Sequence, residues 1–273
     1  MEKLIITVAL NGAEVTRAKN PNIPYTPEEL AEDAARCRDA GAAMVHVHGR
    51  LPDGTPTQDA GVYQRILEAI RARTDVIVQV STGGAVGMGA EERLAPVRLR
   101  PEMASLTTGT VNFGDSVFSN PPDLIEQFAR TMRDYGVVPE IECFDVGHID
   151  NALALVKREI LTLPLHFDFV MGVSGGIAPT VRNLVHMSES LPPGCTWSVA
   201  GIGRAQLPLA TVAIVMGGHV RVGLEDNLYY TRGVPATNAM LVERIVRLAR
   251  ELGREVATPE EARRILRLPQ RRS

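Results

Sequence analysis

Short apolar segments alternate with longer segments of helical periodicity along the whole chain. Eight of the short segments have the length and β-branched content of buried strands: residues 4–10, 44–50, 76–82, 103–109, 138–145, 167–173, 196–203 and 219–226. Apolar residues at helical spacing follow each of them, most clearly at 26–40, 122–135 and 236–252. The pattern therefore predicts eight strand–helix units in succession.

The first predicted helix has clear signals at both ends. Thr26 is suited to cap its start, Pro27 stands at the first helical position, and Glu29 lies three residues after the cap. Gly41 follows the last periodic residue and predicts the end of the helix. These residue types at these positions favour a capped helix over a loop.

Eight strand–helix repeats in about 250 residues imply an α/β protein with a parallel sheet that closes into a (β/α)8, or TIM, barrel. An open doubly wound sheet is the alternative, but such sheets normally carry a glycine-rich fingerprint after the first strand. Residues 11–14 read NGAE, which is not that fingerprint. Since no linker divides the chain, we predict one catalytic domain over residues 1–273, with a short extra helix at 257–268 packed on the outside.

The composition narrows the classes of partner. The chain has 273 residues, of which 45% are hydrophobic and 22% charged, and a net charge of −3. Nucleic-acid binders usually carry a basic patch, so these values favour a small-molecule ligand over nucleic acid. The apolar run at 4–10 is too short to span a membrane. Three unpaired cysteines are typical of a reducing compartment, so we expect a cytoplasmic protein.

The second predicted strand carries a candidate metal site. His46 and His48 are two residues apart, so they share one face of the strand. Two imidazoles at this spacing can bind one Zn²⁺, and Glu225, on the inward phase of the eighth strand, is the natural third ligand. A pair of hydrogen-bonded core histidines is the alternative for His46 and His48. Fe²⁺ or Mn²⁺ can also occupy a site of two histidines and one carboxylate.

Other polar groups lie late on the predicted strands, where the chemistry of such barrels is found. The hydroxyls of Ser81, Ser105 and Thr107 can bind a carboxylate, and Gly83 and Gly84 let backbone N–H groups approach a ligand. Ordinary bonding of these hydroxyls to nearby backbone is the alternative.

Charged residues on three elements complete the set of candidates. Glu142, on the fifth strand, needs a partner if it is buried, and Arg221 on the eighth strand can supply one. Glu14, in the loop after the first strand, can contact a substrate, support the metal or be solvated. A Schiff-base aldolase needs a lysine late on a strand, and none of the three lysines lies there.

The motifs taken together resemble those of the β-keto acid cleavage enzyme family. They occur in order from about residue 4 to 268 and read NGAE, TRA, NPN, VHVHGR, QVSTGGAVG, RLAP, PEMASL, TGT, NFG, PEIE, AGIGR and EDN. The resemblance implies a zinc-dependent TIM barrel, usually a homotetramer. It further implies an exchange in which a β-keto acid reacts with acetyl-CoA to give acetoacetate and a new acyl-CoA.

The resemblance also implies roles for individual residues. By matching motif, the zinc ligands are His46, His48 and Glu225, and Asp226 is the base, supported by Arg221 and Glu142. Ser81 and Ser105 fall where family hydroxyls bind the substrate carboxylate, although position 105 is a threonine in the founding member. Glu14 falls where that member contacts its amino substrate, whereas Thr107 stands in place of an amide.

A zinc-dependent barrel hydrolase that acts on an amide or a lactone is the second reading of the same residues. Such enzymes also use a His-x-His pair, but they place it on the first strand and add histidines at the ends of later strands. Here the pair lies on the second predicted strand, and His166 lies at the start of the sixth. These differences favour the cleavage enzyme.

Overall fold

The computed structural model describes residues 1–269, and its centre is a closed barrel of parallel strands. Around the barrel the strand order is β1-β10-β9-β8-β7-β4-β3-β2. Their bounds are β1 (Ile6–Ala9), β2 (Met44–Val47), β3 (Ile77–Val80), β4 (Met103–Thr107), β7 (Val138–Cys143), β8 (His166–Met171), β9 (Thr196–Gly201) and β10 (His219–Val222). The TIM barrel that the sequence predicts is confirmed.

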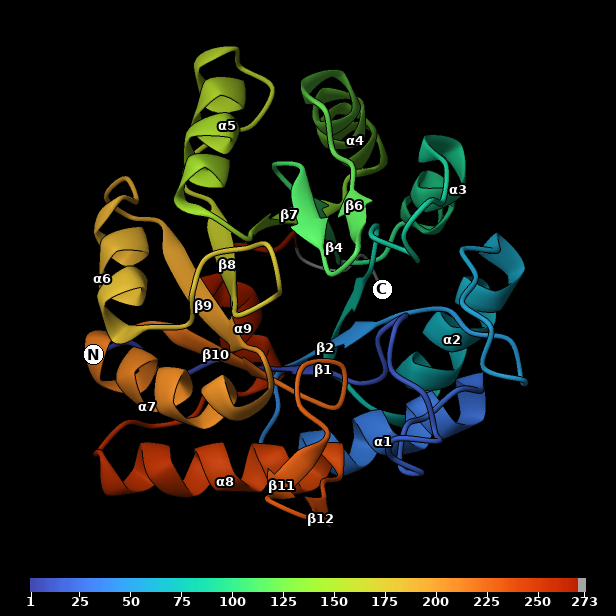
Figure 1. Ribbon diagram of the computed structural model, residues 1–273, viewed down its shortest axis with the longest axis vertical. Helices are drawn as coiled ribbons and strands as arrows, with labels where there is room; N and C mark the ends of the chain where they lie inside the picture. Colours follow the sequence, from blue (N-terminus) through green and yellow to red (C-terminus); the bar gives the residue numbers. More distant parts are fainter. Residues whose placement is uncertain (270–273) are drawn as a thin grey trace.

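Helices surround the strands, as Figure 1 shows. They are α1 (Pro27–Ala40), α2 (Ala60–Arg73), α3 (Ala90–Leu94), α4 (Pro122–Tyr135), α5 (Val146–Lys157), α6 (Val181–Glu189), α7 (Gln206–Met216), α8 (Asn238–Glu251) and α9 (Pro259–Ile265). The cap predicted for α1 is present, because Thr26 Oγ1 accepts from Glu29 N (3.3 Å) and the Glu29 side chain accepts from Thr26 N (3.0 Å). Gly41 ends the helix at a φ of 117°.

Strand residues alternate between the helices and the barrel interior, as a period of two requires. Val45 and Val47 belong to the main apolar cluster between strands and helices, as do Val220 and Val222. The intervening residues of β2 and β10 therefore point into the barrel. This alternation places polar side chains of β2 and β10 in the interior, where the candidate site lies.

The extra helix that the sequence predicts at the C-terminal end is present as α9, packed on the outside of the barrel. It covers the N-terminal mouth, behind the strands in Figure 1. A second apolar cluster joins the two parts, and it contains Ile5, Ala43, Met44, Ile77 and Met103 from the strand side and Ala257, Ala262, Leu266 and Leu268 from the helix side. The apolar side chains at the starts of the strands would contact water if nothing packed on them. The sequence pattern of α9 alone does not show that this helix packs there. The helix thus forms the floor of the barrel.

Two hairpins were not predicted. β5 (Val111–Phe113) pairs with β6 (Ser116–Phe118) after β4, and β11 (Tyr229–Thr231) pairs with β12 (Val234–Pro235) after β10. Strands of two or three residues are too short to show a periodic pattern. Both hairpins extend from the C-terminal ends of barrel strands, the end at which loops build active sites in this fold.

No helix within residues 1–269 is long and apolar enough to cross a membrane.

The position of α9 predicts a large effect of one core truncation. Leu266 is 9% exposed in the floor cluster, whereas Leu252 is 45% exposed. We expect Leu266→Ala to lower the free energy of unfolding by about 2–4 kcal/mol, because it leaves a cavity beneath the barrel. Leu252→Ala should change the same quantity by no more than about 0.5 kcal/mol. Urea unfolding followed by circular dichroism measures both, and equal small changes would show that α9 contributes little to the floor.

Candidate metal centre

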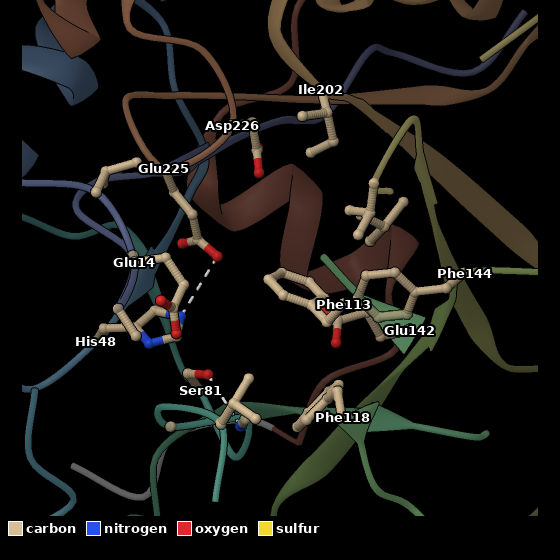
Figure 2. A pocket seen from close by; sticks show the side chains of 18 of the residues that line it. Glu14, His48, Ser81, Phe113, Phe118, Glu142, Phe144, Ile202, Glu225 and Asp226 are labelled. Carbon is tan, nitrogen blue, oxygen red and sulfur yellow. Dashed lines mark hydrogen bonds and ion pairs between the residues drawn. The ribbon is translucent and has the colours of Figure 1, made fainter. Parts of the chain in front are cut away.

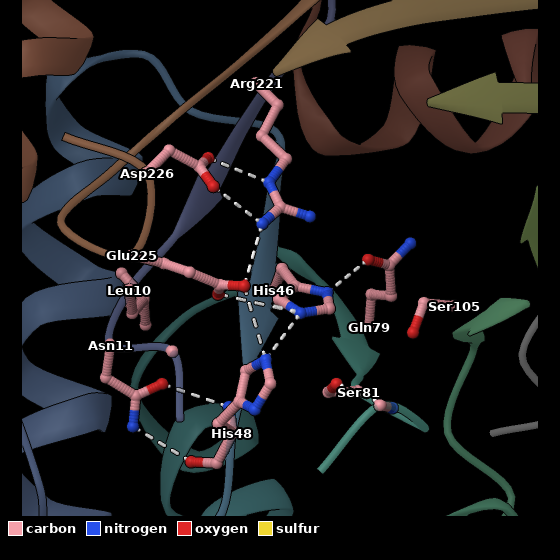
Figure 3. A network of polar contacts seen from close by, with 12 residues as sticks. Leu10, Asn11, His46, His48, Gln79, Ser81, Ser105, Arg221, Glu225 and Asp226 are labelled. Carbon is pink, nitrogen blue, oxygen red and sulfur yellow. Dashed lines mark hydrogen bonds and ion pairs between the residues drawn. The ribbon is translucent and has the colours of Figure 1, made fainter. Parts of the chain in front are cut away.

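Three side chains from the two strands that flank β1 meet at the C-terminal mouth of the barrel. His46 lies on β2, His48 follows the same strand, and Glu225 lies in the loop after β10. The two Nε2 atoms are 3.2 Å apart, and the Glu225 oxygens lie 3.4 Å from His48 Nε2 and 3.7 Å from His46 Nε2. Figure 3 shows the three side chains pointing toward one another. The cluster that the sequence predicts is therefore assembled in the fold.

The geometry of the cluster fits a divalent metal ion. Two donors about 2.0–2.1 Å from a tetrahedral zinc ion lie about 3.3 Å from each other, close to the 3.2–3.7 Å found here. Glu225 Oε2 is buried and has no hydrogen-bond partner in the part of the chain that the structure describes. Within residues 1–269, His46, His48 and Glu225 form a group of His, Cys, Asp or Glu side chains whose ligand atoms lie close enough together, within 4.8 Å of one another, to bind one metal ion. Three protein ligands leave a position for substrate.

Neighbouring amides hold the two imidazoles. Gln79 Oε1 lies 2.5 Å from His46 Nδ1. Asn11 binds the backbone of His48 on both sides, accepting from its N at 3.0 Å and donating to its O at 2.9 Å. Burial lowers the pKa of His46 to about 4, although Glu225 works to raise it. His46 is therefore neutral at neutral pH, which is the form that binds a metal.

Two glycines let Glu225 reach the histidines. At Gly223 the chain leaves β10 with a φ of 139°, and a Cβ there would lie 2.1 Å from the backbone oxygen of Ala9. Gly12 has a φ of +60°, and its Cβ would lie 2.6 Å from Glu225 Cγ. A larger residue at either position would displace the loop or the carboxylate.

A buried guanidinium supports the metal cluster. Arg221 is 2% exposed, and its Nε and Nη2 each donate to Asp226 at 3.0 Å. Its Nη2 also lies 2.9 Å from Glu225 Oε1 (Figure 3). On the other side Nη1 lies 3.6 Å from Glu142 and 3.5 Å from Asp168. Arg221 thus connects the metal cluster to three further carboxyl groups.

Burial changes the acidity of these carboxyl groups. It raises the pKa of Asp226 to about 6, although Arg221 works to lower it. It also raises the pKa values of Glu142 and Asp168 above the ordinary range. For Glu225, burial acts in the same direction, but His48, Arg221 and His46 outweigh it and hold the pKa well below the usual value.

Asp168 is a polar residue of this cluster that sequence reasoning missed. It pairs in register with Glu142, is fully buried, and accepts from Ser198 Oγ at 2.6 Å. The signal was available, because Asp168 stands between Phe167 and Phe169, which pack outward in the main apolar cluster. An acid at that phase of a strand must point into the barrel.

A pocket opens directly above the metal cluster, and its two walls differ in character (Figure 2). Polar groups line one wall and the base, namely Glu14, His48, Ser81, Glu142, Arg221, Glu225 and Asp226. Apolar side chains line the other wall, namely Val86, Phe113, Phe118, Phe144, Val170, Val173 and Ile202. The three phenylalanine rings contact edge to face, with centroids 6.3–6.4 Å apart. Sequence reasoning missed this wall because two of the rings come from the β5–β6 hairpin.

The residues predicted to bind substrate divide into two groups. Glu14, Ser81, Gly83 and Gly84 line the pocket, and Ser81 Oγ accepts from Gly83 N at 3.1 Å.

Ser105 and Thr107 lie beneath the pocket lining that the described residues form. Ser105 Oγ accepts from Thr82 N at 3.2 Å, and Thr107 Oγ1 donates to Glu142 Oε2 at 2.6 Å. Both hydroxyls thus have protein partners, so a direct contact of either with substrate stays a prediction.

Comparison with known proteins decides the family. The sequence profile of the β-keto acid cleavage enzymes matches residues 3–268. The chain belongs to this family. A 3-keto-5-aminohexanoate cleavage enzyme of Fusobacterium nucleatum subsp. nucleatum is 55% identical over 271 residues, which cover 98% of this chain and 99% of that one. A 3-oxoadipate:acetyl-CoA acetyltransferase of Cupriavidus necator is 42% identical over 271 residues, covering 97% and 95%.

Solved structures support the same fold. The ternary complex of ObcA with a C4-CoA adduct and oxalate has a TM-score of 0.76 and 23% identity, and the match covers 91% of this chain and 68% of that one. This likeness concerns the barrel alone. As a member of the β-keto acid cleavage enzyme family the chain is an enzyme, and its pocket lies at the end of the barrel where TIM-barrel enzymes carry their chemistry.

The contact between Gly12 and Glu225 predicts an effect on metal binding. We expect Gly12→Ala to weaken Zn²⁺ binding by at least about ten-fold, because the new methyl group displaces the Glu225 side chain. Gly114→Ala is the matched control, since Gly114 has nearly the same φ (+62°) and a methyl group added there would meet no side chain within 4 Å. Competition of each protein with a chromophoric chelator measures the affinity. Equal affinities of the two variants would contradict the assigned position of Glu225.

Proposed function

We propose that the protein is a zinc-dependent β-keto acid cleavage enzyme that exchanges acyl groups between a β-keto acid and acetyl-CoA. In this reaction R–CO–CH₂–COO⁻ and acetyl-CoA give R–CO–CoA and acetoacetate. Family membership and the names of the relatives support the reaction type. The observation that carries the proposal is the cluster of His46, His48 and Glu225 beside the Arg221–Asp226 pair at the base of the pocket.

The roles of the residues follow from their positions. His46, His48 and Glu225 would hold the ion, which when bound supplies Lewis-acid polarisation of the keto oxygen. Asp226 lines the same end of the pocket. As the general base, its carboxylate would accept a proton from the reacting substrate. Arg221 fixes both oxygens of Asp226, so the carboxylate stays in one orientation. Glu142 and its partner Thr107 hold the other side of Arg221.

The two walls of the pocket suggest how a keto acid is bound. Ser81 Oγ accepts from Gly83 N, so its own O–H and the backbone N–H of Gly84 offer donors to the substrate carboxylate. Glu14 offers a carboxylate on the same rim, which suits a substrate with an ammonium group and agrees with the amino substrate in the name of the relative from Fusobacterium nucleatum. The apolar wall opposite accommodates the carbon chain.

The proposal also covers the domain organisation, the cellular location and the oligomeric state. We take residues 1–273 as one catalytic domain, because the barrel and the β5–β6 hairpin line one pocket and α9 covers the opposite end of the same barrel. A cytoplasmic location is supported by the free thiols of Cys37, Cys143 and Cys195. A homotetramer is supported by exposed apolar side chains on α7, among them Val215, which is 52% exposed.

One assay tests the proposed reaction. Purified protein loaded with Zn²⁺ is mixed with a panel of β-keto acids, with and without acetyl-CoA, and acetoacetate is measured. We expect acetoacetate only when acetyl-CoA is present, and we expect chelation of the metal or His46→Ala to reduce the rate by at least about 100-fold, since the Lewis acid is then lost.

The variant Asp226→Asn is measured in the same assay. It should keep its Zn²⁺ and lose about 10²–10⁴-fold in kcat, the usual contribution of a general base. Turnover that needs no acetyl-CoA, with an amide or lactone as substrate, would support the hydrolase instead. No turnover of any keto acid by fully loaded protein would refute the proposed reaction.

The position of Glu14 predicts a selective change in substrate preference. We expect Glu14→Gln to raise KM for an amino-bearing β-keto acid by about ten-fold or more, because a charge-assisted hydrogen bond is worth about 1.5–3 kcal/mol. The KM for a β-keto acid of the same length whose side chain carries no charge should stay within about two-fold. A uniform change for both substrates would assign Glu14 to the structure of the pocket instead of to recognition of the amine.

A further inference from the structure

The side-chain amide of Gln79 lies between the metal cluster and a buried acid deeper in the barrel. Gln79 pairs in register with His46 on the neighbouring strand, and its Oε1 lies 2.5 Å from His46 Nδ1. Its Nε2 is buried and forms no hydrogen bond of normal geometry with the described residues. The Gln79 side chain also interacts with the carboxyl group of Glu140 on β7, whose pKa it lowers by acting as a donor.

Glu140 has few partners for so deeply buried an acid. It is 1% exposed, and neither of its oxygens accepts a hydrogen bond of normal geometry from a group within residues 1–269. His166 Nε2 lies 3.3 Å from it, and the His166 ring is fixed by Thr196 Oγ1 at 2.8 Å from Nδ1. Burial works to raise the pKa of Glu140, but His166, then Arg221 and Gln79, outweigh burial and lower it. Glu140 is thus a carboxylate, which accepts hydrogen bonds and donates none.

This property of Glu140 decides which way the Gln79 amide points. The two ends of a glutamine amide have nearly the same shape, so their surroundings determine their orientation. A carboxylate on one side attracts the NH₂ end and repels the carbonyl oxygen. The carbonyl oxygen then faces His46, where it can only accept. His46 must therefore carry its proton on Nδ1, and the lone pair of Nε2 points toward His48 and Glu225.

We propose that Glu140 is a positioning residue that selects the metal-binding tautomer of His46 through the Gln79 amide. The proposal rests on the metal centre of the proposed function, although it concerns the protein before any metal is bound. Where the group at position 140 can also donate, as an amide does, the Gln79 amide can reverse. Its NH₂ group would then face His46 Nδ1, favour the Nε2–H tautomer, and place a proton where the metal must bind.

A second buried acid separates this role from a general effect of replacing a buried carboxyl group. Asp168 is also fully buried, lies on the neighbouring strand, and lies 3.5 Å from Arg221 Nη1. Its hydrogen-bond partner is Ser198, not an amide next to a metal ligand. Glu140→Gln and Asp168→Asn each replace one buried carboxyl group by an amide, but only the first replaces the acceptor-only group beside Gln79 by one that both donates and accepts.

The test uses metal-free protein labelled with ¹⁵N-histidine. Long-range ¹H–¹⁵N spectra distinguish the two tautomers of His46, and competition with a chromophoric chelator measures the affinity for Zn²⁺. We expect the Nδ1–H tautomer in the unsubstituted protein and a mixture of tautomers in Glu140→Gln. The same variant should bind Zn²⁺ roughly ten-fold more weakly, at the lower end of the range for outer partners of metal ligands. Asp168→Asn should keep the Nδ1–H tautomer.

Three results would overturn the proposal. They are an Nε2–H tautomer in the unsubstituted protein, an unchanged tautomer and affinity in Glu140→Gln, and a mixture of tautomers in Asp168→Asn as well. The first measurement needs no variant, so it can refute the proposal even where Glu140→Gln does not fold. None of these readouts depends on turnover. A protein without keto-acid cleavage activity would refute the proposed reaction and leave this inference standing.

Discussion

One buried positive charge faces several carboxyl groups inside the barrel, and the chemistry of the site depends on this imbalance. The guanidinium of Arg221 contacts Glu142, Asp168, Glu225 and Asp226. A single guanidinium cannot balance four buried carboxylates, so burial raises the pKa values of three of them. The fourth, Glu225, stays ionised beside the two imidazoles. A divalent ion at this position would offset the remaining negative charge, which is the physical reason to expect one.

The barrel separates this charged region from the part that stabilises the fold. Apolar side chains fill the N-terminal end, and α9 covers them with Ala262, Leu266 and Leu268. Polar side chains occupy the interior above this floor, and the pocket opens at the opposite mouth. The deeper polar residues have a function in our proposal. Glu140 and Gln79 lie on other strands than His46, and together they orient its imidazole. Stability and reactivity can therefore vary at opposite ends of one barrel.

The pocket combines a fixed base with walls that come from loops and a hairpin. The base consists of side chains on or next to β2 and β10, whose orientation is set by the sheet. The apolar wall depends on Phe113 and Phe118 of the β5–β6 hairpin and on Phe144 after β7. Family members named for different keto acids share the fold. A rigid base with a wall built from loops suits a family in which the reaction is kept and the substrate side chain changes.

The sequence by itself determined what depends on local periodicity. Alternation along β2 places His46 and His48 on one face, the residue types of the EDN motif make Glu225 a candidate ligand, and Thr26 caps α1 through residues three positions apart. Only the tertiary structure decided which side chains contact one another. It turned the chain at Gly223 so that Glu225 reaches the histidines, placed Asp168 beside Arg221, directed the Thr107 hydroxyl to Glu142, brought the hairpin phenylalanines over the pocket and set α9 beneath the strands. A period of two shows which face a side chain takes, but distances across the barrel and the choice of hydrogen-bond partner depend on residues far away in the chain.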